Sequence, residues 1–169
     1  DNIPNSKNIA VHNFGTTREA QNVVLFNASL GVGCSLLLDG RLHRGSKFRA
    51  GLIDDLLIPD NRSNTLKTVD QLAGGFSVLN DLEQSGNRGG TNLAHRLIRA
   101  IENANQGNQD AINALVHAGQ SLAYVITVTQ GLLHPEQFLL SGPLMESEIY
   151  FDAVRAKLPE PNGPEFVQN

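Results

Sequence analysis

A glycine-bearing turn between two apolar runs is the first segment of the sequence that could form a binding site. It reads Ser29-Leu30-Gly31-Val32-Gly33. Glycine lets a backbone approach a ligand closely, and successive amide groups in such a turn can hold the oxygens of a phosphate. A Gly-x-Gly turn between strands is more often a plain connection. The turn therefore predicts either phosphate binding around Gly31 and Gly33 or only a change of chain direction.

Polar side chains near the start and in the middle of the chain are candidates for binding a hydroxylated ligand. Asn2 and Asn5 each carry an amide that can donate and accept hydrogen bonds to sugar hydroxyls, although both also suit a terminal loop. Asp54 and Asp55 form an acidic pair ahead of an apolar run. The pair also has a simpler interpretation as a solvated turn.

The chain shows no residue spacing typical of a metal site. Its single cysteine, Cys34, excludes an intramolecular disulfide and a cysteine-rich zinc site. Cys34 lies in a glycine-rich apolar run, which favours a small core residue over a reactive thiol. The histidines are far apart in the sequence; they are His12, His43, His95, His117 and His134. We expect no bound metal and no cofactor.

Composition indicates one soluble globular domain. The chain has 169 residues, of which 40% are hydrophobic and 18% charged, so it can bury a core of its own. Its formal net charge is −4 and its basic residues are scattered, which argues against a nucleic-acid-binding face in this segment. No apolar run approaches the roughly 20 residues of a membrane helix, and the first residues do not form a basic-then-apolar leader. We expect a cytoplasmic protein that does not contact a membrane.

The first third of the chain predicts an antiparallel β-meander. Residues 23–28 and 34–38 are apolar runs with strand character, and residues 41–43 form a return strand. Asp39-Gly40 between the second and third runs is a strong hairpin signal, because glycine accepts the positive φ that the turn requires. Residues 48–57 are expected to form a connector, and residues 59–65 a polar loop.

Helices are predicted for most of the remaining chain, which makes the fold an α/β layered domain. Thr68 is expected to cap a helix, and the Gly74-Gly75 pair within it predicts a kink or a close contact with a neighbour. Thr91 is expected to cap the next helix.

The last third of the chain predicts a long helix, a strand and a final helix. The long helix covers residues 110–133 and is apolar on more than one side near its end, which implies burial between neighbours. His134-Pro135 ends this helix, and residues 137–140 form a short strand. The final helix is expected at residues 146–158, followed by a flexible tail at residues 159–169.

Six short motifs occur in a fixed order along the chain. They are Ser29 to Gly33, Asp39-Gly40, Arg44-Gly45, Ala50-Gly51, Leu132 to Glu136 and Ser141-Gly142. Together they resemble the motifs of ROK proteins, a family of repressors and sugar kinases, and the resemblance covers nearly the whole chain. It implies the second lobe of the actin-like, ribonuclease-H-like ATPase fold, with an antiparallel β-meander followed by helices packed on a mixed sheet.

Positions that carry kinase chemistry in the ROK family are changed in this chain. Asn2 to Asn5 lies on the family's Asn-Asp-Ala-Asn, whose Asp resembles a base that takes the proton of the sugar hydroxyl. The chain has Ile3 at that position, which cannot accept a proton, and a shifted register would place the weakly basic Ser6 there. Ser29, Gly31 and Gly33 are expected to be a remnant of the phosphate loop, because Ser29-Leu30-Gly31 replaces its Gly-Thr-Gly.

The sugar and zinc motifs of the family are altered as well. Leu52 stands in place of the sugar-binding Glu, and residues 60–67 replace the zinc loop without a cysteine. Asp70 corresponds to a family acid that reaches the sugar, although a carboxylate just inside a helix start is also favourable by itself. Asp55 stands in place of the family's His. The implied ligand-binding residues are Asn2, Asn5, Asp55 and Asp70, and no catalytic residue is implied.

The favoured hypothesis is a non-catalytic domain that senses a ligand and oligomerises within a ROK-type transcriptional regulator of carbohydrate metabolism. Residues 1–158 are expected to form this lobe, and the start at Asp1, inside a family motif, favours a fragment with a DNA-binding domain upstream. The expected partners are a second copy of the chain, a sugar or sugar-derived effector, and DNA only through the upstream domain. The alternatives are the C-terminal half of a divergent ATP-dependent sugar kinase and a dimerisation module that binds no ligand.

Overall fold

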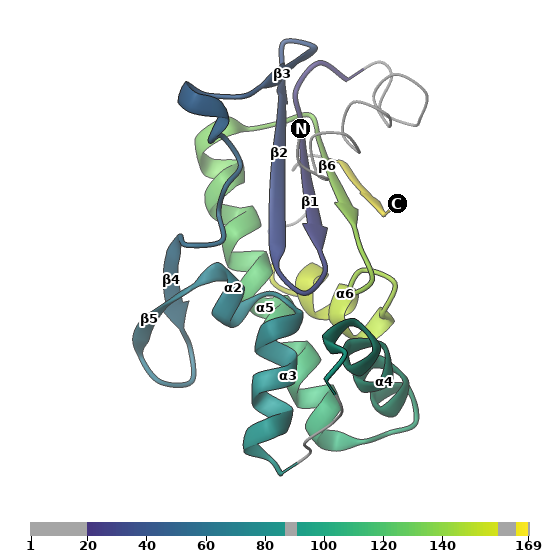
Figure 1. Cartoon of the computed structure of the whole chain (residues 1–169). Helices are drawn as coiled ribbons and strands as arrows, with labels where there is room; N and C mark the ends of the chain where they lie inside the picture. The colour runs from purple at the N-terminus through teal and green to yellow at the C-terminus, as the bar shows by residue number, and fades with distance from the viewer. Residues whose placement is uncertain (1–19, 87–90, 159–164, 169) are drawn as a thin grey trace.

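A five-stranded mixed sheet forms the centre of the fold (Figure 1). The structure is a computed structural model and describes residues 20–86, 91–158 and 165–168. The strands are β1 Val23–Ala28, β2 Val32–Leu38, β3 Arg41–His43, β6 Gln137–Ser141 and β7 Glu165–Gln168. They lie in the order β3-β2-β1-β6-β7. β2 pairs antiparallel with β1 and with β3, whereas β6 pairs parallel with β1 and with β7.

The β-meander predicted from the sequence is confirmed. β1 pairs with β2 from Val23 opposite Leu37 onward. Both residues of the Asp39-Gly40 turn have positive φ, 50° and 70°, as a two-residue hairpin requires. β2 begins at Val32, two residues earlier than predicted. The preceding turn is short because the Ser29 amide donates a hydrogen bond to the carbonyl of Gly31, at 2.9 Å.

Four residues of the predicted flexible tail belong to the sheet. Glu165–Gln168 form β7, which pairs with β6, so the prediction of a flexible tail is wrong for these residues. The Phe166 ring stacks on Phe138, with 5.4 Å between ring centroids. This aromatic contact supplies apolar burial that the polar composition of the tail did not indicate.

A two-stranded hairpin includes the polar loop expected at residues 59–65. Residues 61–64 form its exposed turn, as expected, but Pro59, Asp60 and Thr65 belong to its strands, so the prediction is wrong for these three. β4 spans Leu57–Asp60 and β5 spans Thr65–Thr68, paired antiparallel. Ile58 and Asp60 are buried, whereas Leu57 and Pro59 are exposed. The strand was not recognised because one of its two buried positions holds an aspartate instead of an apolar residue.

The predicted kink at Gly74-Gly75 divides the first helix into two. α2 spans Val69–Leu72 and begins with a capping box at Thr68, as expected, and α3 spans Gly75–Gln84. A Cβ at Gly74 would lie 2.6 Å from the carbonyl oxygen of Leu30. Only glycine therefore allows the helix break to pack against the turn between β1 and β2.

The other helices differ from the predictions mainly at their ends. They are α4 Leu93–Asn105, α5 Gln109–Leu133 and α6 Glu148–Arg155. Asn92 caps α4, because its side chain accepts a hydrogen bond from the amide of His95 at 3.1 Å, so the assignment of Thr91 as the cap is wrong. α6 begins later than predicted because Ser147 caps it, and it ends at Arg155 instead of residue 158. His134 ends α5 as expected, in the left-handed conformation with φ of 44°.

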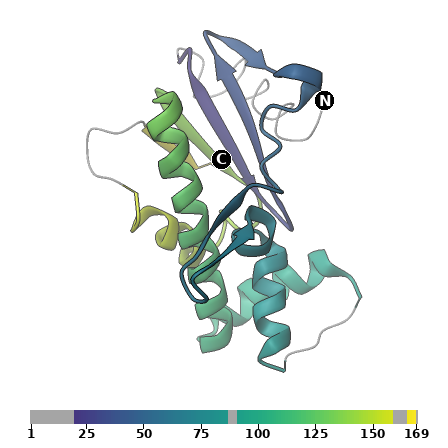
Figure 2. The ribbon, with the colours of Figure 1, turned by 90° about the vertical axis from the view of Figure 1, so that its left-hand side faces the viewer.

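α5 is the central helix of the lobe and runs beside the sheet (Figure 2). It contacts α2, α3, α4, α6 and β4, and its buried residues lie on more than one side, as predicted. Gly119 lets α6 approach closely, since a Cβ there would lie 2.6 Å from the carbonyl oxygen of Tyr150. The 25 residues of α5 are long and apolar enough to cross a membrane. Its contacts on several sides are those of a core helix.

Candidate functional site

An acidic cleft opens between the β1–β2 turn, the loop that precedes β4, and the start of α2. These segments lie side by side in Figure 1. The volume of the cleft is about 270 Å³, and its lining includes no lysine or arginine. The lining residues are Gly31, Val32, Gly33, Gly51, Leu52, Ile53, Asp54 and Asp70. Two carboxylates therefore set the charge of this cleft.

Asp70 is held in the cleft by the first turn of α2 and by the β1–β2 turn. The capping box at Thr68 fixes the start of α2, two residues before Asp70. The Asp70 Oδ1 accepts a hydrogen bond from the amide of Val32 at 2.9 Å. Its Oδ2 packs against Gly31, where an added Cβ would lie only 2.8 Å away. Because glycine has no Cβ, position 31 leaves room for the Asp70 carboxylate.

The surroundings of Asp70 disfavour its ionised form. Partial burial raises the pKa of this carboxyl, the hydrogen bond from the Val32 amide lowers it, and the negative charges of Asp54 and Asp55 raise it again. The net result is a pKa above the usual range of an aspartate. A carboxylate in a negative cleft can accept hydrogen bonds from a neutral hydroxylated ligand, but it repels an anion.

Two amides of the β1–β2 turn are engaged within the protein. The Ser29 amide donates to the carbonyl of Gly31, and the next amide after Gly31 donates to Asp70. The Ser29 and Leu30 carbonyls accept hydrogen bonds from the first two amides of α3, at 2.8 Å each. A phosphate at Ser29, Gly31 and Gly33 would therefore find the Ser29 and Val32 amides already engaged and would meet a carboxylate. Ser29 does not line the cleft, whereas both glycines do.

A second cavity, the apolar groove, lies between the C-terminal half of α5, β2 and β4. Its volume is about 330 Å³, and six large side chains that line it are 37–78% exposed. They are Leu56, Leu57, Tyr124, Val128, Leu132 and Leu133. Gly51 and Ile53 line both the groove and the acidic cleft. The loop that precedes β4 thus forms a shared wall.

Comparison with known proteins identifies the family. The sequence profile described as "ROK family" matches residues 2–161. The chain belongs to the ROK family. As a ROK protein it has the expected fold, because it superimposes on a ROK family glucokinase from Streptomyces griseus in complex with glucose and AMPPNP. The TM-score is 0.81 at 16% identity, over 99% of this chain and 62% of the glucokinase.

Curated ROK relatives include both enzymes and regulators. A bifunctional NanE/NanK enzyme of Brucella melitensis is 24% identical over 147 residues, which are 87% of this chain and 27% of the enzyme. The DNA-binding transcriptional dual regulator NagC of Escherichia coli is 21% identical over 148 residues, which are 83% of this chain and 36% of NagC. The chain thus spans only about a quarter to a third of these relatives, and similarity to both leaves the two functions open.

The structure places one of the ligand-binding residues implied by the ROK resemblance in the acidic cleft. Asp70 lies in the acidic cleft. Asp55 is exposed and does not line the cleft, but its neighbour Asp54 does. Asn2 and Asn5 lie outside the described residues, so their role stays a prediction.

Gly51 and Leu52 line the cleft, although the sequence does not predict either as a ligand-binding residue. Leu52, the residue in place of the ROK sugar-binding Glu, lines the cleft and is 49% exposed. Gly51 has φ of 80°, and an added Cβ would lie 2.2 Å from the carbonyl oxygen of Cys34. The Ala50-Gly51 motif is the sequence signal for this part of the cleft, since glycine permits a close backbone contact.

The residues expected to replace the ROK zinc loop belong to the β4–β5 hairpin. Across residues 20–86, 91–158 and 165–168, no group of three or more His, Cys, Asp or Glu side chains is placed to hold a metal ion. Cys34 is buried, and burial raises the pKa of its thiol to about 12, with a smaller opposing effect from the Ser35 amide. The interpretation of Cys34 as a core residue is confirmed.

Proposed function

We propose that this ROK lobe is the ligand-sensing and oligomerising domain of a cytoplasmic transcriptional regulator and that it carries out no phosphoryl transfer. Its ligand is a neutral sugar or sugar derivative that binds in the acidic cleft, with Asp70 as an acceptor of hydroxyl hydrogen bonds. The DNA-binding domain is a separate part of the protein.

The contact between Asp70 and the β1–β2 turn carries this proposal. Phosphoryl transfer depends almost entirely on positioning and on neutralising the charge of the phosphates. In this lobe two amides of the turn that resembles the phosphate loop are engaged, and a carboxylate packs against Gly31. The acidic cleft therefore offers hydrogen-bond acceptors for a hydroxylated ligand beside a turn that disfavours phosphate. That combination suits a sensor better than a kinase.

A sugar kinase is the second candidate, favoured by the likeness to the glucokinase with its TM-score of 0.81. The likeness supports the fold, whereas the kinase reaction would also require a base and a phosphate site. The position of the expected base, Ile3, lies outside the described residues. The charge of the acidic cleft is the argument against this candidate.

Assays of the full-length protein distinguish the two candidates. We expect no ATP-dependent phosphorylation of any member of a panel of monosaccharides that begins with glucose. We also expect binding to DNA from the region upstream of the protein's own gene, with an affinity that changes when the effector sugar is added. Sugar-dependent ATP turnover, with no binding to DNA, would favour the kinase and refute the regulator.

Self-association through the apolar groove is part of the proposed function. The exposed parts of its six large side chains amount to roughly 500 Å², at the upper end of the apolar patches found on monomers. We expect the wild-type protein to sediment as a dimer or larger oligomer. Leu132→Lys is expected to shift it to monomer, because Leu132 is 78% exposed in the groove and the fold does not need it.

Leu66→Lys is the matched control for this test. Leu66 is 63% exposed on β5 and does not line the groove. The control is expected to keep the oligomer of the wild type. A monomeric wild type, or an oligomer that survives Leu132→Lys, would contradict the assignment of the groove.

A further inference from the structure

A cluster of charged side chains lies where the tip of the β4–β5 hairpin meets α3 and α5. We call it the hairpin cluster. It is separate from the acidic cleft and has no assigned role. Its members are Asp60, Arg62, Lys67, Asp81 and His117.

His117 is the centre of the hairpin cluster. It lies on α5, is 8% exposed, and has one carboxylate facing each ring nitrogen. The Nε2 is 3.4 Å from Oδ1 of Asp60, and the Nδ1 is 3.5 Å from Oδ2 of Asp81. These are ion-pair distances, somewhat longer than a well-formed hydrogen bond. The ring therefore bridges the hairpin to α3.

Asp60 is buried at the hairpin tip and accepts hydrogen bonds from several groups of the hairpin. It is 2% exposed, and its Oδ2 accepts from Lys67 Nζ at 2.7 Å and from the Ser63 hydroxyl at 2.6 Å. Its Oδ1 accepts from the amide of Arg62 at 2.9 Å. Burial alone would raise the pKa of Asp60, but these hydrogen bonds and the charge of Lys67 outweigh it and hold the pKa well below its usual range. Asp60 therefore remains a carboxylate opposite His117.

Arg62 reaches from the hairpin to both helices. Its guanidinium pairs with Asp81 on α3, and its Nη2 donates to the carbonyl of Asn113 on α5 at 3.0 Å. Burial alone would raise the pKa of Asp81, but the contacts with His117 and Arg62 lower it overall. The two carboxylates of the cluster thus each face His117 and one basic side chain, Lys67 for Asp60 and Arg62 for Asp81.

The hairpin has little else to hold it. A two-stranded hairpin alone is marginally stable in water. Only Ile58 anchors its apolar side in the core, because Leu57 and Leu66 are 56% and 63% exposed. Figure 1 shows the hairpin projecting away from the main sheet. The hairpin cluster is therefore the main tie between its tip and the helices.

The other end of the hairpin leads directly to the acidic cleft. β5 ends at Thr68, which caps α2 two residues before Asp70. The Asp70 amide donates to the carbonyl of Asp54 at 3.3 Å, and the Val69 amide donates to that of Leu56 at 2.9 Å. A movement of the hairpin would therefore displace the Asp70 carboxylate and the loop that forms the shared wall.

We propose that the hairpin cluster is a latch that fixes the β4–β5 hairpin on α3 and α5, and that Arg62 and His117 thereby act as positioning residues for Asp70. In the ROK resemblance the same segment is the zinc loop, so ion pairs hold this hairpin where the family pattern has a metal. The effect on ligand binding rests on the proposed function, whereas the holding of the hairpin does not.

Hydrogen exchange of the full-length protein, followed by mass spectrometry, tests the latch without any ligand. Arg62→Ala removes the pair with Asp81 and the bond to Asn113, and is expected to speed exchange of peptides covering residues 57–68 by about tenfold. His117→Phe, which keeps the buried volume, is expected to act in the same direction. Peptides from β1 and β6 are expected to exchange as in the wild type.

Arg96→Ala is the matched control. Arg96 on α4 pairs with Glu83 on α3 at 2.6 Å, away from the hairpin, so this variant also removes one ion pair of α3. It is expected to leave exchange in residues 57–68 unchanged. The latch is refuted if Arg62→Ala leaves the hairpin peptides unchanged, or if all peptides of the lobe accelerate equally.

A binding measurement then tests the positioning role. For a sugar that stabilises the wild type, Arg62→Ala is expected to weaken binding by about tenfold, because the cleft loses its fixed acceptor. Arg62→Lys keeps a cation beside Asp81 and is expected to restore part of the affinity. Unchanged affinity in Arg62→Ala, with faster hairpin exchange, would overturn the positioning role. If no sugar binds the wild type, the proposed function fails while the exchange result still stands.

Discussion

Gly51→Ala is expected to destabilise the protein by roughly 3 kcal/mol, the sum of a left-handed conformation imposed on alanine and a steric clash. Gly51 has φ of 80°, and the new Cβ would lie 2.2 Å from the carbonyl oxygen of Cys34 in β2. Neither group can move easily, because the Cys34 amide also donates a hydrogen bond to the carbonyl of Gly51, at 3.3 Å. Chemical denaturation of the variant and the wild type measures this difference.

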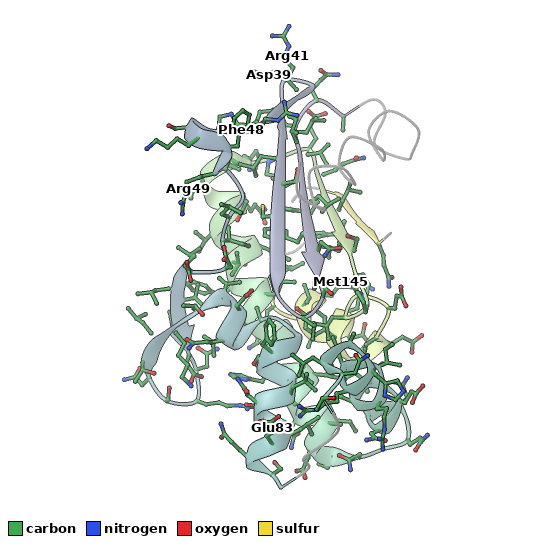
Figure 3. The ribbon with its side chains drawn as sticks, viewed as in Figure 1. Asp39, Arg41, Phe48, Arg49, Glu83 and Met145 are labelled. Carbon is green, nitrogen blue, oxygen red and sulfur yellow. The ribbon has the colours of Figure 1, made fainter. Side chains whose placement is uncertain are left out.

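Gly107→Ala is the control that shows how much of the stability loss comes from backbone strain and how much from the steric clash. Gly107 has φ of 90°, but an added Cβ would meet no atom within 4 Å. This control is expected to lose only about 1 kcal/mol, the cost of the left-handed conformation. Equal losses in the two variants would show that the contact between the loop and β2 is looser than described. Figure 3 shows the side chains of Phe48 and Arg49 on the chain that leads into this loop.

Asp70→Asn is expected to raise the stability of the protein while it weakens ligand binding. The pKa of Asp70 is raised, so the folded protein disfavours the ionised form of this carboxyl. Asparagine removes that charge and can still accept the hydrogen bond from the amide of Val32. A group that costs stability and lies in a cleft is typical of a binding site. Thermal unfolding of both proteins at neutral pH checks the first effect.

The raised pKa of Asp70 also predicts how the stability difference between the wild type and Asp70→Asn changes with pH. A raised pKa means that the folded state binds more protons than the unfolded state, so the contribution of Asp70 to stability improves as the pH falls through its folded pKa. The stability advantage of Asp70→Asn is therefore expected to shrink as the solution is made acidic. Asp55→Asn, which alters an exposed carboxylate outside the cleft, is expected to have the smaller effect. An advantage that grows on acidification would contradict the pKa direction.

The sequence was sufficient for most of the fold because the signals there are local. Asp39-Gly40 specifies its own hairpin, Thr68 its own capping box, and His134-Pro135 the end of α5. The Gly74-Gly75 pair predicted a close contact, and the structure supplies the partner, the β1–β2 turn. The hairpin turn, the capping box and the helix end depend on residues within a few positions of one another.

Features that depend on distant residues were not predictable in the same way. The hairpin at residues 57–68 was missed because its inward-facing Asp60 is compensated by His117, 57 positions later in the chain. A histidine is conspicuous in a sequence mainly through metal-ligand spacing, which the contacts of His117 with Asp60 and Asp81 do not follow. Asp54 was predicted only as half of an acidic pair, and the fold decided that it, and not Asp55, lines the cleft.

Thermal unfolding with a panel of neutral monosaccharides and sugar phosphates tests the ligand-sensing role most directly. A sugar at 100 times its Kd is expected to stabilise the wild-type protein by about 2.7 kcal/mol. We predict that at least one neutral sugar raises the Tm of the wild type but not that of Asp70→Asn, and that sugar phosphates raise neither. If no neutral sugar shifts the wild type, or if the same sugar shifts both proteins equally, the assignment of the acidic cleft as the sensor site is wrong.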